Sequence, residues 1–423
     1  MEADGDREDV AERVRAFYER HPYPPPVESL EKYRQLWKDR QRRRADFHLF
    51  WPGRAYREDH SILIAGCGTS QAAKHAVRWP DARVTGIDFS ATSVRHTEDL
   101  KRKYQLHNLE VRQLPLERAD ELGATFDHIV CTGVLHHLAD PAAGLAALRE
   151  VLAPDGAMHL MVYAPYGRTG VYMLQELCRR LGVAATDDGI RDLVAALELL
   201  PVGHPLGALL RAAPDFREPT ALADALLHPQ DRAYTVSQLY ELLEAVGLTF
   251  GRWVWQAPYD ARCGVVARIP QAAGLAALPP REQSAAAELF RGTMLRHSVV
   301  AYRADAPDVS RPLDFAGDGW PSYVPIRMPD TIVVEERLPA GAAAVLINRN
   351  HAHTDIFLPI DAEERRLYRA IDGKRPIREL ARPGAELQAA SAFFERLYRY
   401  DQVAFDASLA FGVAPDARDR RSL

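Results

Sequence analysis

Apolar positions follow two different spacings along the first half of the chain. Short apolar runs end at glycine, proline or aspartate, and between these runs apolar residues recur every three or four positions. Short runs are typical of buried strands, and the wider spacing is typical of amphipathic helices. Their alternation predicts an α/β fold with a parallel sheet. The predicted strands are 61–65, 82–87, 109–114, 126–131 and 158–163.

Residues 1–58 precede this alternation and predict a helical cap. Helical spacing over 10–18 indicates one helix, and a second helix is expected at about 30–50. The proline-rich segment 21–26 separates them, and it is expected to be extended because prolines fix φ and lack an amide donor. The second helix carries four clustered arginines, which either meet an anionic partner or form a solvated face: Arg40, Arg42, Arg43 and Arg44.

Residues from about 170 to 230 are rich in alanine and leucine, and their spacing predicts a helical insertion that acts as a lid. A helix at 238–246 should follow. Strands at 248–255 and 264–267 are then expected to complete the sheet. The α/β domain is thus predicted to cover 59–268, with a linker and helix over 269–305.

The C-terminal part, 306–423, is predicted to be a separate α+β domain. Strands at 331–334 and 344–347 precede three helices and a last strand, which resemble a winged helix: 362–371, 377–381, 386–400 and 402–405. Residues 361–406 contain nine Lys/Arg and nine Asp/Glu. A neutral module of this kind is more typical of protein interaction or homodimerisation than of DNA recognition. The tail 416–423 is predicted to be disordered.

Composition narrows the class of protein. The net charge of −5 over 423 residues argues against a nucleic-acid partner. The four cysteines are scattered, which indicates neither a disulfide framework nor a zinc site and suits a cytoplasmic protein. Acidic residues open the chain where a signal peptide would be basic and then apolar. No apolar run reaches the roughly 18 residues of a membrane span, so no membrane partner is expected.

A glycine turn follows the first predicted strand and points to a nucleoside. Gly66 and Gly68 let the backbone approach a ligand closely, and Asp88 ends the next strand twenty residues after Gly68. An acid at this position accepts hydrogen bonds from ribose hydroxyls. Gln71 stands where a dinucleotide site has its third glycine, and no phosphate-binding Lys-Ser or Lys-Thr pair follows. The pattern therefore favours a nucleoside without phosphates.

These motifs resemble the class I S-adenosylmethionine-dependent methyltransferases, as does the Gly-Val-Leu-His-His stretch at 133–137. The resemblance covers about 62–266. It implies a Rossmann-like sheet, S-adenosylmethionine as the cofactor, and a cofactor site at the ends of the strands. The residues that it implies as cofactor contacts are Ala65, Gly66, Cys67, Gly68, Asp88, Phe89, Leu116, Thr132, Gly133 and Tyr23.

The acceptor side of the site is expected beyond the fourth and fifth strands. His136 and His137 are candidates for a general base, or they pack beneath the cofactor. Tyr163 and Tyr166 are candidates for orienting the acceptor. Two further candidates are Arg168, which suits a carboxylate, and His21, which with Tyr23 would form a gate. No metal is expected, because no acid accompanies the histidine pair in this loop.

Three functions remain open from the sequence. The first is methyl transfer to a nucleophilic O, N or C of a small molecule. The second is methylation of a protein or peptide, because the stretch 289–297 and the C-terminal module are loosely similar to bacterial protein-lysine methyltransferases. The third is a non-catalytic sensor or scaffold that binds S-adenosylmethionine.

Overall fold

The computed structural model describes residues 2–212, 218–306 and 308–413. The chain divides into two compact units, and each unit combines separate stretches of sequence. Unit 1 collects the residues up to Tyr33, Asp59–Leu248 and Arg291–Ser298, whereas unit 2 collects Arg34–Glu58, Thr249–Phe290 and the residues from Val299 onward. The predicted tail at 416–423 lies outside the described residues, and the contiguous domain boundaries stay a prediction.

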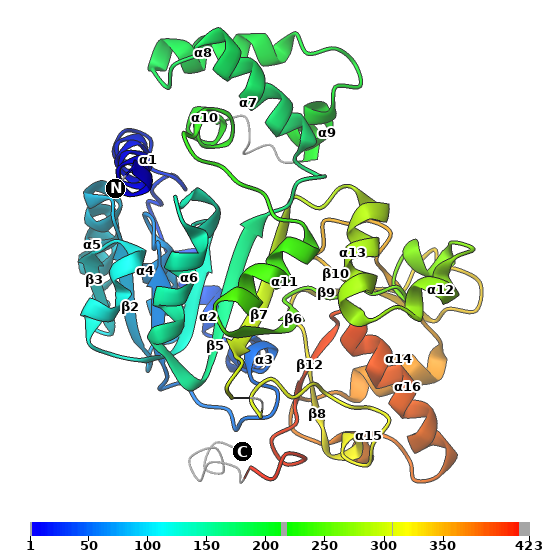
Figure 1. Cartoon of the computed structure of the whole chain (residues 1–423). Helices are drawn as coiled ribbons and strands as arrows, with labels where there is room; N and C mark the ends of the chain where they lie inside the picture. Colours follow the sequence, from blue (N-terminus) through cyan, green and yellow to red (C-terminus); the bar gives the residue numbers. More distant parts are fainter. Residues whose placement is uncertain (1, 213–217, 307, 414–423) are drawn as a thin grey trace. The chain divides into compact units, whose positions relative to one another are not determined.

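A seven-stranded sheet in the order β3-β2-β1-β4-β5-β7-β6 forms the centre of the α/β fold (Figure 1). Its strands are β1 (Ser61–Ala65), β2 (Arg83–Asp88), β3 (Leu109–Gln113), β4 (Phe126–Thr132), β5 (Leu152–Tyr163), β6 (Leu248–Trp253) and β7 (Arg296–Arg303). The first five pair in parallel, as the alternating pattern predicts. The chain leaves β1 toward β2 on one side and returns to β4 on the other, which creates a switch point for ligand binding.

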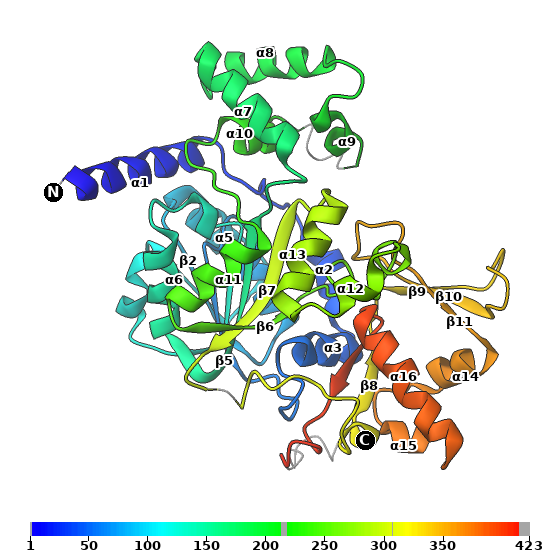
Figure 2. The same cartoon turned by 45° about the vertical axis from the view of Figure 1, so that its right-hand side comes forward.

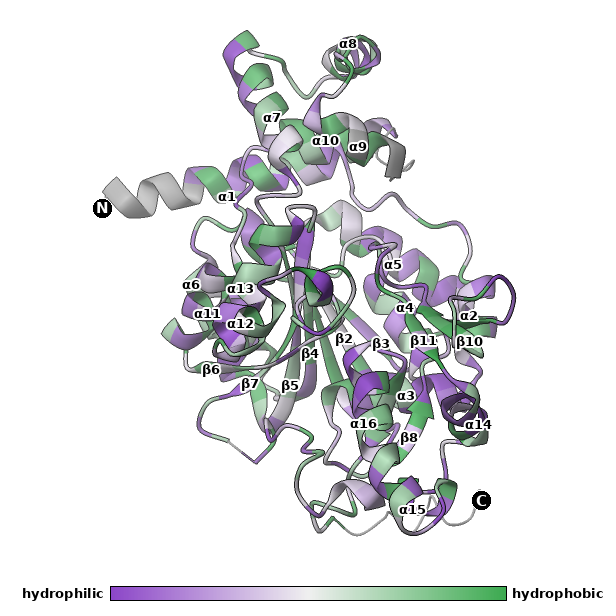
Figure 3. Cartoon of the chain, turned by 90° about the vertical axis from the view of Figure 1, so that its right-hand side faces the viewer, coloured by the Kyte–Doolittle hydropathy of each residue, from purple (hydrophilic) through white to green (hydrophobic). Residues whose placement is uncertain are grey.

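Burial explains why the inner strands are apolar. Every residue of β1 is buried, whereas β3 at the edge has the polar sequence Leu-Glu-Val-Arg-Gln and buries only Leu109. Figure 3 shows the hydrophobic colour concentrated in the inner strands of the sheet. Inner parallel strands are covered on both faces, so they read as continuous apolar runs.

Four of the helices that connect the strands are α4 (Gln71–Arg78), α5 (Ala91–Tyr104), α6 (Pro141–Glu150) and α11 (Val236–Ala245). Three of these, α5, α6 and α11, begin at a side-chain cap. The side chain of Ser90 accepts from the amide of Ser93 at the start of α5, and Asp140 does the same for α6. Each cap satisfies a backbone donor that the first helical turn leaves unpaired.

The predicted strand at 264–267 is wrong. Gly264 has a φ of +62°, and Val266–Arg268 forms a short 3-10 turn. A left-handed residue interrupts extended backbone, and the amide of Val265 instead donates to Asp355 Oδ2 at 2.8 Å. The strand that lies between β5 and β6 in the sheet is β7, which falls in the stretch 269–305 that was predicted to be a linker and a helix. The helix α13 in this stretch spans Pro280–Arg291 and ends before β7 begins.

The N-terminal region is helical as predicted, but its second helix is broken. The helices are α1 (Glu2–Arg20), α2 (Glu31–Trp37) and α3 (Arg40–Phe50). Asp39 interrupts the expected single helix because its carboxylate accepts from the amide of Gln41 and caps α3. Within unit 2, Arg42 pairs bidentately with Asp330 at 2.9 and 3.0 Å. The arginine cluster therefore contains an ion pair inside the molecule.

The stretch predicted as a helical insertion contains four helices among the residues that the structure describes. They are α7 (Thr169–Leu181), α8 (Asp187–Glu198), α9 (Pro205–Ala212) and α10 (Pro219–Leu227). An apolar cluster that includes Val171, Leu174 and Leu222 holds the helices together. They gather beyond the carboxyl ends of the parallel strands (Figures 1 and 2). The insertion consequently covers the edge where α/β sheets bind ligands.

Unit 2 contains the predicted α+β elements of the C-terminal part. Helices α14 (Ala362–Ala370), α15 (Ile377–Leu380) and α16 (Ala385–Arg399) pack with an aromatic core that includes Phe393, Phe394 and Phe405. The strands are β9 (Thr331–Val334), β10 (Ala344–Asn348) and β11 (Leu358–Ile360) in one sheet, and β8 (Val324–Arg327) with β12 (Val403–Asp406) in another. The sequence analysis missed β8 and β11, which are short and contain Pro325 and Pro359. The winged-helix likeness stays a prediction.

Candidate functional site

The glycine turn after β1 takes a conformation that side chains disfavour. Gly66 and Gly68 have φ of +73° and +53°. A Cβ atom at Gly66 would lie 2.3 Å from Val134 Cγ2, so the β4 loop closes against bare backbone. The amides of Gly66 and Cys67 both donate to the carbonyl of Ile87, at 2.9 and 2.8 Å. The turn is therefore tied to the end of β2, where the acid of the motif lies.

Asp88 is buried at that end, and two backbone amides hold its carboxylate. Its Oδ2 accepts from the amide of Gly68 at 2.8 Å, and its Oδ1 accepts from Ser90 at 2.9 Å. A carboxylate has about four acceptor positions, so each oxygen keeps one for a ribose hydroxyl. Burial raises the pKa of Asp88 to about 6, although both amide hydrogen bonds act in the opposite direction.

Close packing of α4 on the sheet depends on a glycine in the strand. A Cβ atom at Gly86 of β2 would lie 2.6 Å from Ala72 Cβ and 3.3 Å from Cys67. In dinucleotide sites a third glycine after the turn allows this approach. Here that position is Gln71, whose side-chain amide donates to Thr132 Oγ1 at 3.1 Å. The glycine that relieves the contact thus lies on the strand and not on the helix.

The N-terminal segment lies against the glycine turn. Thr69 Oγ1 donates to the carbonyl of Pro24 at 2.8 Å, and the carbonyl of Tyr23 is 3.7 Å from a Cβ position at Gly68. Further along, Glu19 of α1 accepts from the amide of Ala91 at 2.6 Å. Tyr23 is therefore beside the turn, where a gate over a cofactor would be.

The other predicted cofactor contacts also come from strand ends. Phe89 is half-buried and its ring centroid lies 6.3 Å from that of Tyr18. Burial raises the pKa of the Cys67 thiol well above its usual value. The remaining positions are Ala65 at the end of β1, Leu116 at the start of the 3-10 helix Leu116–Leu122, and Thr132 and Gly133 where β4 ends.

A stack of three side chains marks the acceptor side. The ring of His136 lies 3.9 Å from that of Tyr163, and the guanidinium carbon of Arg168 lies 3.6 Å from the same tyrosine ring. His136 is fully buried, and burial lowers its pKa well below the usual value, which leaves it neutral at pH 7. Burial likewise raises the pKa of the Tyr163 hydroxyl well above its usual value.

Arg168 is already paired with an acid. Its Nη2 lies 3.2 Å from Asp231 Oδ2, and its Nε donates to the hydroxyl of Tyr172 at 3.2 Å. Gln175 also donates to Asp231 Oδ2, at 2.9 Å. A substrate carboxylate at Arg168, as predicted from the sequence, would therefore compete with Asp231 for the guanidinium group.

Several residues around the stack were not predicted from the sequence because they belong to the insertion or follow it. Asp224 of α10 is 4% exposed and accepts from the hydroxyl of Tyr18 at 3.0 Å. His228 lies on His137, with ring centroids 3.9 Å apart. One signal was present, because Asp224 interrupts the otherwise apolar run Ala221–Leu227. A lone acid in a buried helix needs a polar partner.

Two predicted site residues lie apart from the stack. Tyr166 is 40% exposed, and its carbonyl accepts from Thr169 Oγ1 at 2.7 Å. His21 is buried, and its Nε2 donates to the carbonyl of Ala185 at 2.8 Å, between α7 and α8. His21 therefore fastens α1 to the insertion in this structure.

Comparison with known proteins gives the class of the domain. A family model described as a methyltransferase domain matches residues 63–158. An uncharacterized protein of Synechococcus sp. is 33% identical over 251 residues, which is 57% of this chain and 59% of that protein. The malonyl-[acyl-carrier protein] O-methyltransferase of Acetivibrio thermocellus is 28% identical over 120 residues, 28% of this chain and 41% of that protein. The chain thus spans about half the length of these curated relatives.

Among solved structures, PKMT2 from Rickettsia typhi superposes with a TM-score of 0.62 at 15% identity, over 90% of this chain and 76% of that one. Its complex with AdoHcy gives 0.61 at 16% identity, over 91% and 77%. At such identities the likeness shows a shared fold. Together with the glycine turn, the acid at the tip of β2 and the family match, it identifies a class I S-adenosylmethionine-dependent methyltransferase domain.

None of the described helices has the length and apolar character needed to cross a membrane.

Proposed function

We propose that this protein transfers the methyl group of S-adenosylmethionine to a nucleophilic atom of a small molecule. The observation that carries the acceptor class is the burial of the groups beyond β4 and β5. His136, His137 and Arg168 are all at most 6% exposed, and the insertion helices contribute to the same cluster. A site with such walls admits a small or slender acceptor.

The cofactor would be held by the turn and the acid. The backbone of Gly66 and Gly68 offers close approach for the amino-acid part, and Asp88 offers two acceptor positions for the ribose. Phe89 would cover the adenine, next to the ring of Tyr18. When bound, S-adenosylmethionine supplies an activated methyl group: the acceptor's electron pair forms the new bond to carbon while the carbon–sulfur bond breaks toward sulfur.

The protein itself would contribute by orienting the acceptor and by excluding water from the reacting centre. Tyr163 is fixed between Arg168 and His136, so it presents an oriented wall to the acceptor. Holding reactants at near-attack distance lowers such barriers by roughly 7–11 kcal/mol. The buried setting also excludes water from the reacting centre. His136 is neutral at pH 7, so it has a lone pair with which to take the acceptor's proton.

A second candidate is methylation of a protein or peptide. It is favoured by the extent of the likeness to PKMT2, which spans 90% of this chain and therefore goes beyond the sheet. In this candidate, unit 2 recognises the acceptor chain and a single side chain enters the buried site. Against it, the curated relatives with named substrates are O-methyltransferases of a carrier-bound malonyl group and of ubiquinone biosynthesis.

Labelled S-adenosylmethionine tests these functions. The full chain is incubated with labelled cofactor and bacterial extract that has been separated by size. Label in the small-molecule fraction supports the proposal, and label in the protein fraction supports the second candidate. Binding of S-adenosylhomocysteine with no transferred label in either fraction would overturn both, and would leave a sensor or scaffold. The Asp88→Ala variant serves as the control for cofactor-dependent labelling.

A further inference from the structure

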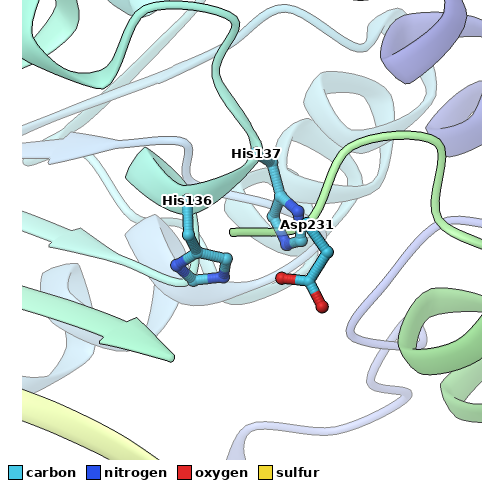
Figure 4. Close-up of side chains that lie close together, drawn as sticks. All are labelled: His136, His137 and Asp231. Carbon is cyan, nitrogen blue, oxygen red and sulfur yellow. The ribbon is translucent and has the colours of Figure 1, made fainter. Parts of the chain in front are cut away.

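Three buried side chains converge beside the proposed acceptor site. His136 and His137 come from the 3-10 turn Leu135–His137 after β4, whereas Asp231 comes from the segment after α10 (Figure 4). One ligand atom from each lies within 4.8 Å of the others. A metal was not expected from the sequence because no acid accompanies the histidine pair in its loop, and the fold brings an acid from 94 residues further along the chain.

Hydrogen bonds leave the right atoms available. Three buried atoms have no hydrogen-bond partner among the residues that the structure describes: both ring nitrogens of His136 and Oδ1 of Asp231. Buried polar atoms without partners are costly, so such atoms call for a ligand. Three of them within one cluster, from two separate segments, are the observation on which the inference depends.

The neighbouring contacts orient these ligand atoms. His137 Nδ1 lies 2.7 Å from the carbonyl of Gln230, which only accepts, so Nδ1 carries the proton and Nε2 keeps its lone pair. Asp231 Oδ2 accepts from Gln175 and pairs with Arg168, which leaves Oδ1 without a partner among the described residues. Histidines and carboxylates that bind metals are held from behind by partners of these kinds.

A second cluster nearby is explained without an ion. It consists of His137, Asp224 and His228. His228 Nδ1 accepts from the amide of Gln230 at 3.0 Å, so a neutral His228 carries its proton on Nε2 and has no second lone pair to give. Asp224 already accepts from Tyr18. Only the first cluster therefore combines free lone pairs with burial.

From this geometry we propose that His136, His137 and Asp231 bind one divalent transition-metal ion, with Zn²⁺ as the probe of choice. Two imidazoles and one carboxylate suit Zn²⁺ better than Mg²⁺ or Ca²⁺, which prefer all-oxygen sites. Tetrahedral ligands at roughly 2.0–2.2 Å from zinc lie about 3.3 Å apart, so the three side chains, whose ligand atoms lie within 4.8 Å of one another, need to close by at most about 1.5 Å. With three protein ligands, one position stays open.

The open position would let the ion coordinate the acceptor. This part of the inference rests on the proposed function. An ion there supplies a Lewis acid that lowers the pKa of a coordinated hydroxyl. The acceptor class would then be a molecule with an oxygen donor that is deprotonated to be methylated. His136 acts in this case as a ligand and not as a base.

Zinc content of the full chain tests the site. The protein is stripped with a chelator, dialysed against Zn²⁺, and assayed for bound zinc; binding of Co²⁺ is followed by its visible spectrum. We expect about one ion per chain in the natural protein. His136→Phe, which keeps the ring on Tyr163, and Asp231→Asn should each lower the zinc content at least tenfold. Asp224→Asn is the matched control and should retain the ion.

Binding of S-adenosylhomocysteine to each variant separates this inference from the proposed function. A chain that binds S-adenosylhomocysteine but no zinc overturns the metal site and leaves the methyltransferase intact. A chain that binds zinc but no S-adenosylhomocysteine supports the metal site and overturns the proposed methyltransferase function. Equal zinc content in the natural protein and in His136→Phe also overturns the proposal, and so does loss of the ion in Asp224→Asn with Asp231→Asn unaffected.

Discussion

Asp88 connects the two turns that would enclose the nucleoside. One carboxylate oxygen binds the glycine turn through Gly68, and the other binds the start of α5 through Ser90. The side chain therefore shapes the site as well as offering acceptors to a ligand. Its removal is expected to have both effects.

Asp88→Ala should weaken binding of S-adenosylhomocysteine by about 100-fold or more. Two hydrogen bonds to a charged group are lost, each worth about 1.5–3 kcal/mol, and each 1.4 kcal/mol is tenfold in affinity. Titration calorimetry measures the change. Glu110→Ala, which removes an exposed acid from the adjacent β3, should bind as the natural protein does. Unchanged affinity in Asp88→Ala would refute the ribose role.

Affinity for S-adenosylhomocysteine should also fall in acid. The pKa of Asp88 is raised from 3.8 to about 6, so the free protein takes up a proton as pH drops through 6. Ribose hydroxyls bind the ionised form, and affinity at pH 5 should be about tenfold lower than at pH 8. The stability of the protein without ligand changes with pH in the opposite direction. The raised pKa of Asp88 stabilises the folded state at low pH, and this contribution is lost as pH rises through 6. Asp88→Asn should bind with a flat pH profile, and a profile as steep as that of the natural protein would contradict the assignment.

At the scale of elements, α4 packs closely on β2 in the cofactor half of the site. Gly86 faces Ala72 across this contact, and Cys67 of the turn lies against the same glycine. The packing therefore couples the position of the turn to the strand that carries Asp88. An ordinary side chain at position 86 has to push α4 outward.

Gly86→Ala should destabilise the fold by about 1–3 kcal/mol, because the extra methyl overpacks this contact. It should also weaken S-adenosylhomocysteine binding, since the turn moves with α4. Thermal unfolding and calorimetry measure the two effects. Gly274→Ala is the matched control: it lies in α12 (Ala272–Ala276) with open space around a Cβ, and alanine favours helix. Equal stability of both variants would contradict this account.

The insertion helices contribute side chains next to the proposed acceptor site. Asp224, His228 and Asp231 come from α10 and the segment after it, while the histidine pair comes from the 3-10 turn after β4. A change that loosens α7 to α10 is therefore expected to affect the acceptor side without changing the glycine turn. This division allows one sheet to serve many acceptors through different insertions.

At the scale of the whole molecule, the two units are not consecutive stretches of chain. Within unit 2, α3 from the N-terminal region packs with β12 and β8 from the C-terminal region. The hydroxyl of Tyr302 also donates to the carbonyl of Phe50 at 2.6 Å. Unit 2 thus depends on parts of the chain some 250 residues and more apart in sequence.

A chain that ends at Asp305 should be less stable than the full chain. It lacks β8, β12 and the aromatic core, so the face of α3 that packs on β8 and β12 becomes exposed. We expect a lower unfolding temperature and strong binding of a hydrophobic dye, because a large apolar patch is uncovered. Phe394→Ala in the full chain should cost about 3–5 kcal/mol by the same logic. An unfolding temperature equal to that of the full chain would show that the residues after Asp305 are not needed for stability.

Local pattern was enough to predict the class of fold and a glycine turn that lies beside Asp88. The strands 61–65, 109–114 and 126–131, the glycine turn and Asp88 lie close together in sequence, and each is read from its own neighbours. The class I methyltransferase domain and its α/β sheet are confirmed. The site roles of individual residues stay predictions, and they are the subject of the experiments above.

Long-range contacts decided the remainder. The seventh strand of the sheet comes from 296–303 and not from 264–267, because strand pairing rewards partners that no local pattern records. For the same reason the acid beside His136 and His137 was invisible until the insertion folded over the sheet and brought Asp231 within reach. Local spacing governs which segments become helix or strand, whereas burial and polar satisfaction across distant segments govern which side chains meet.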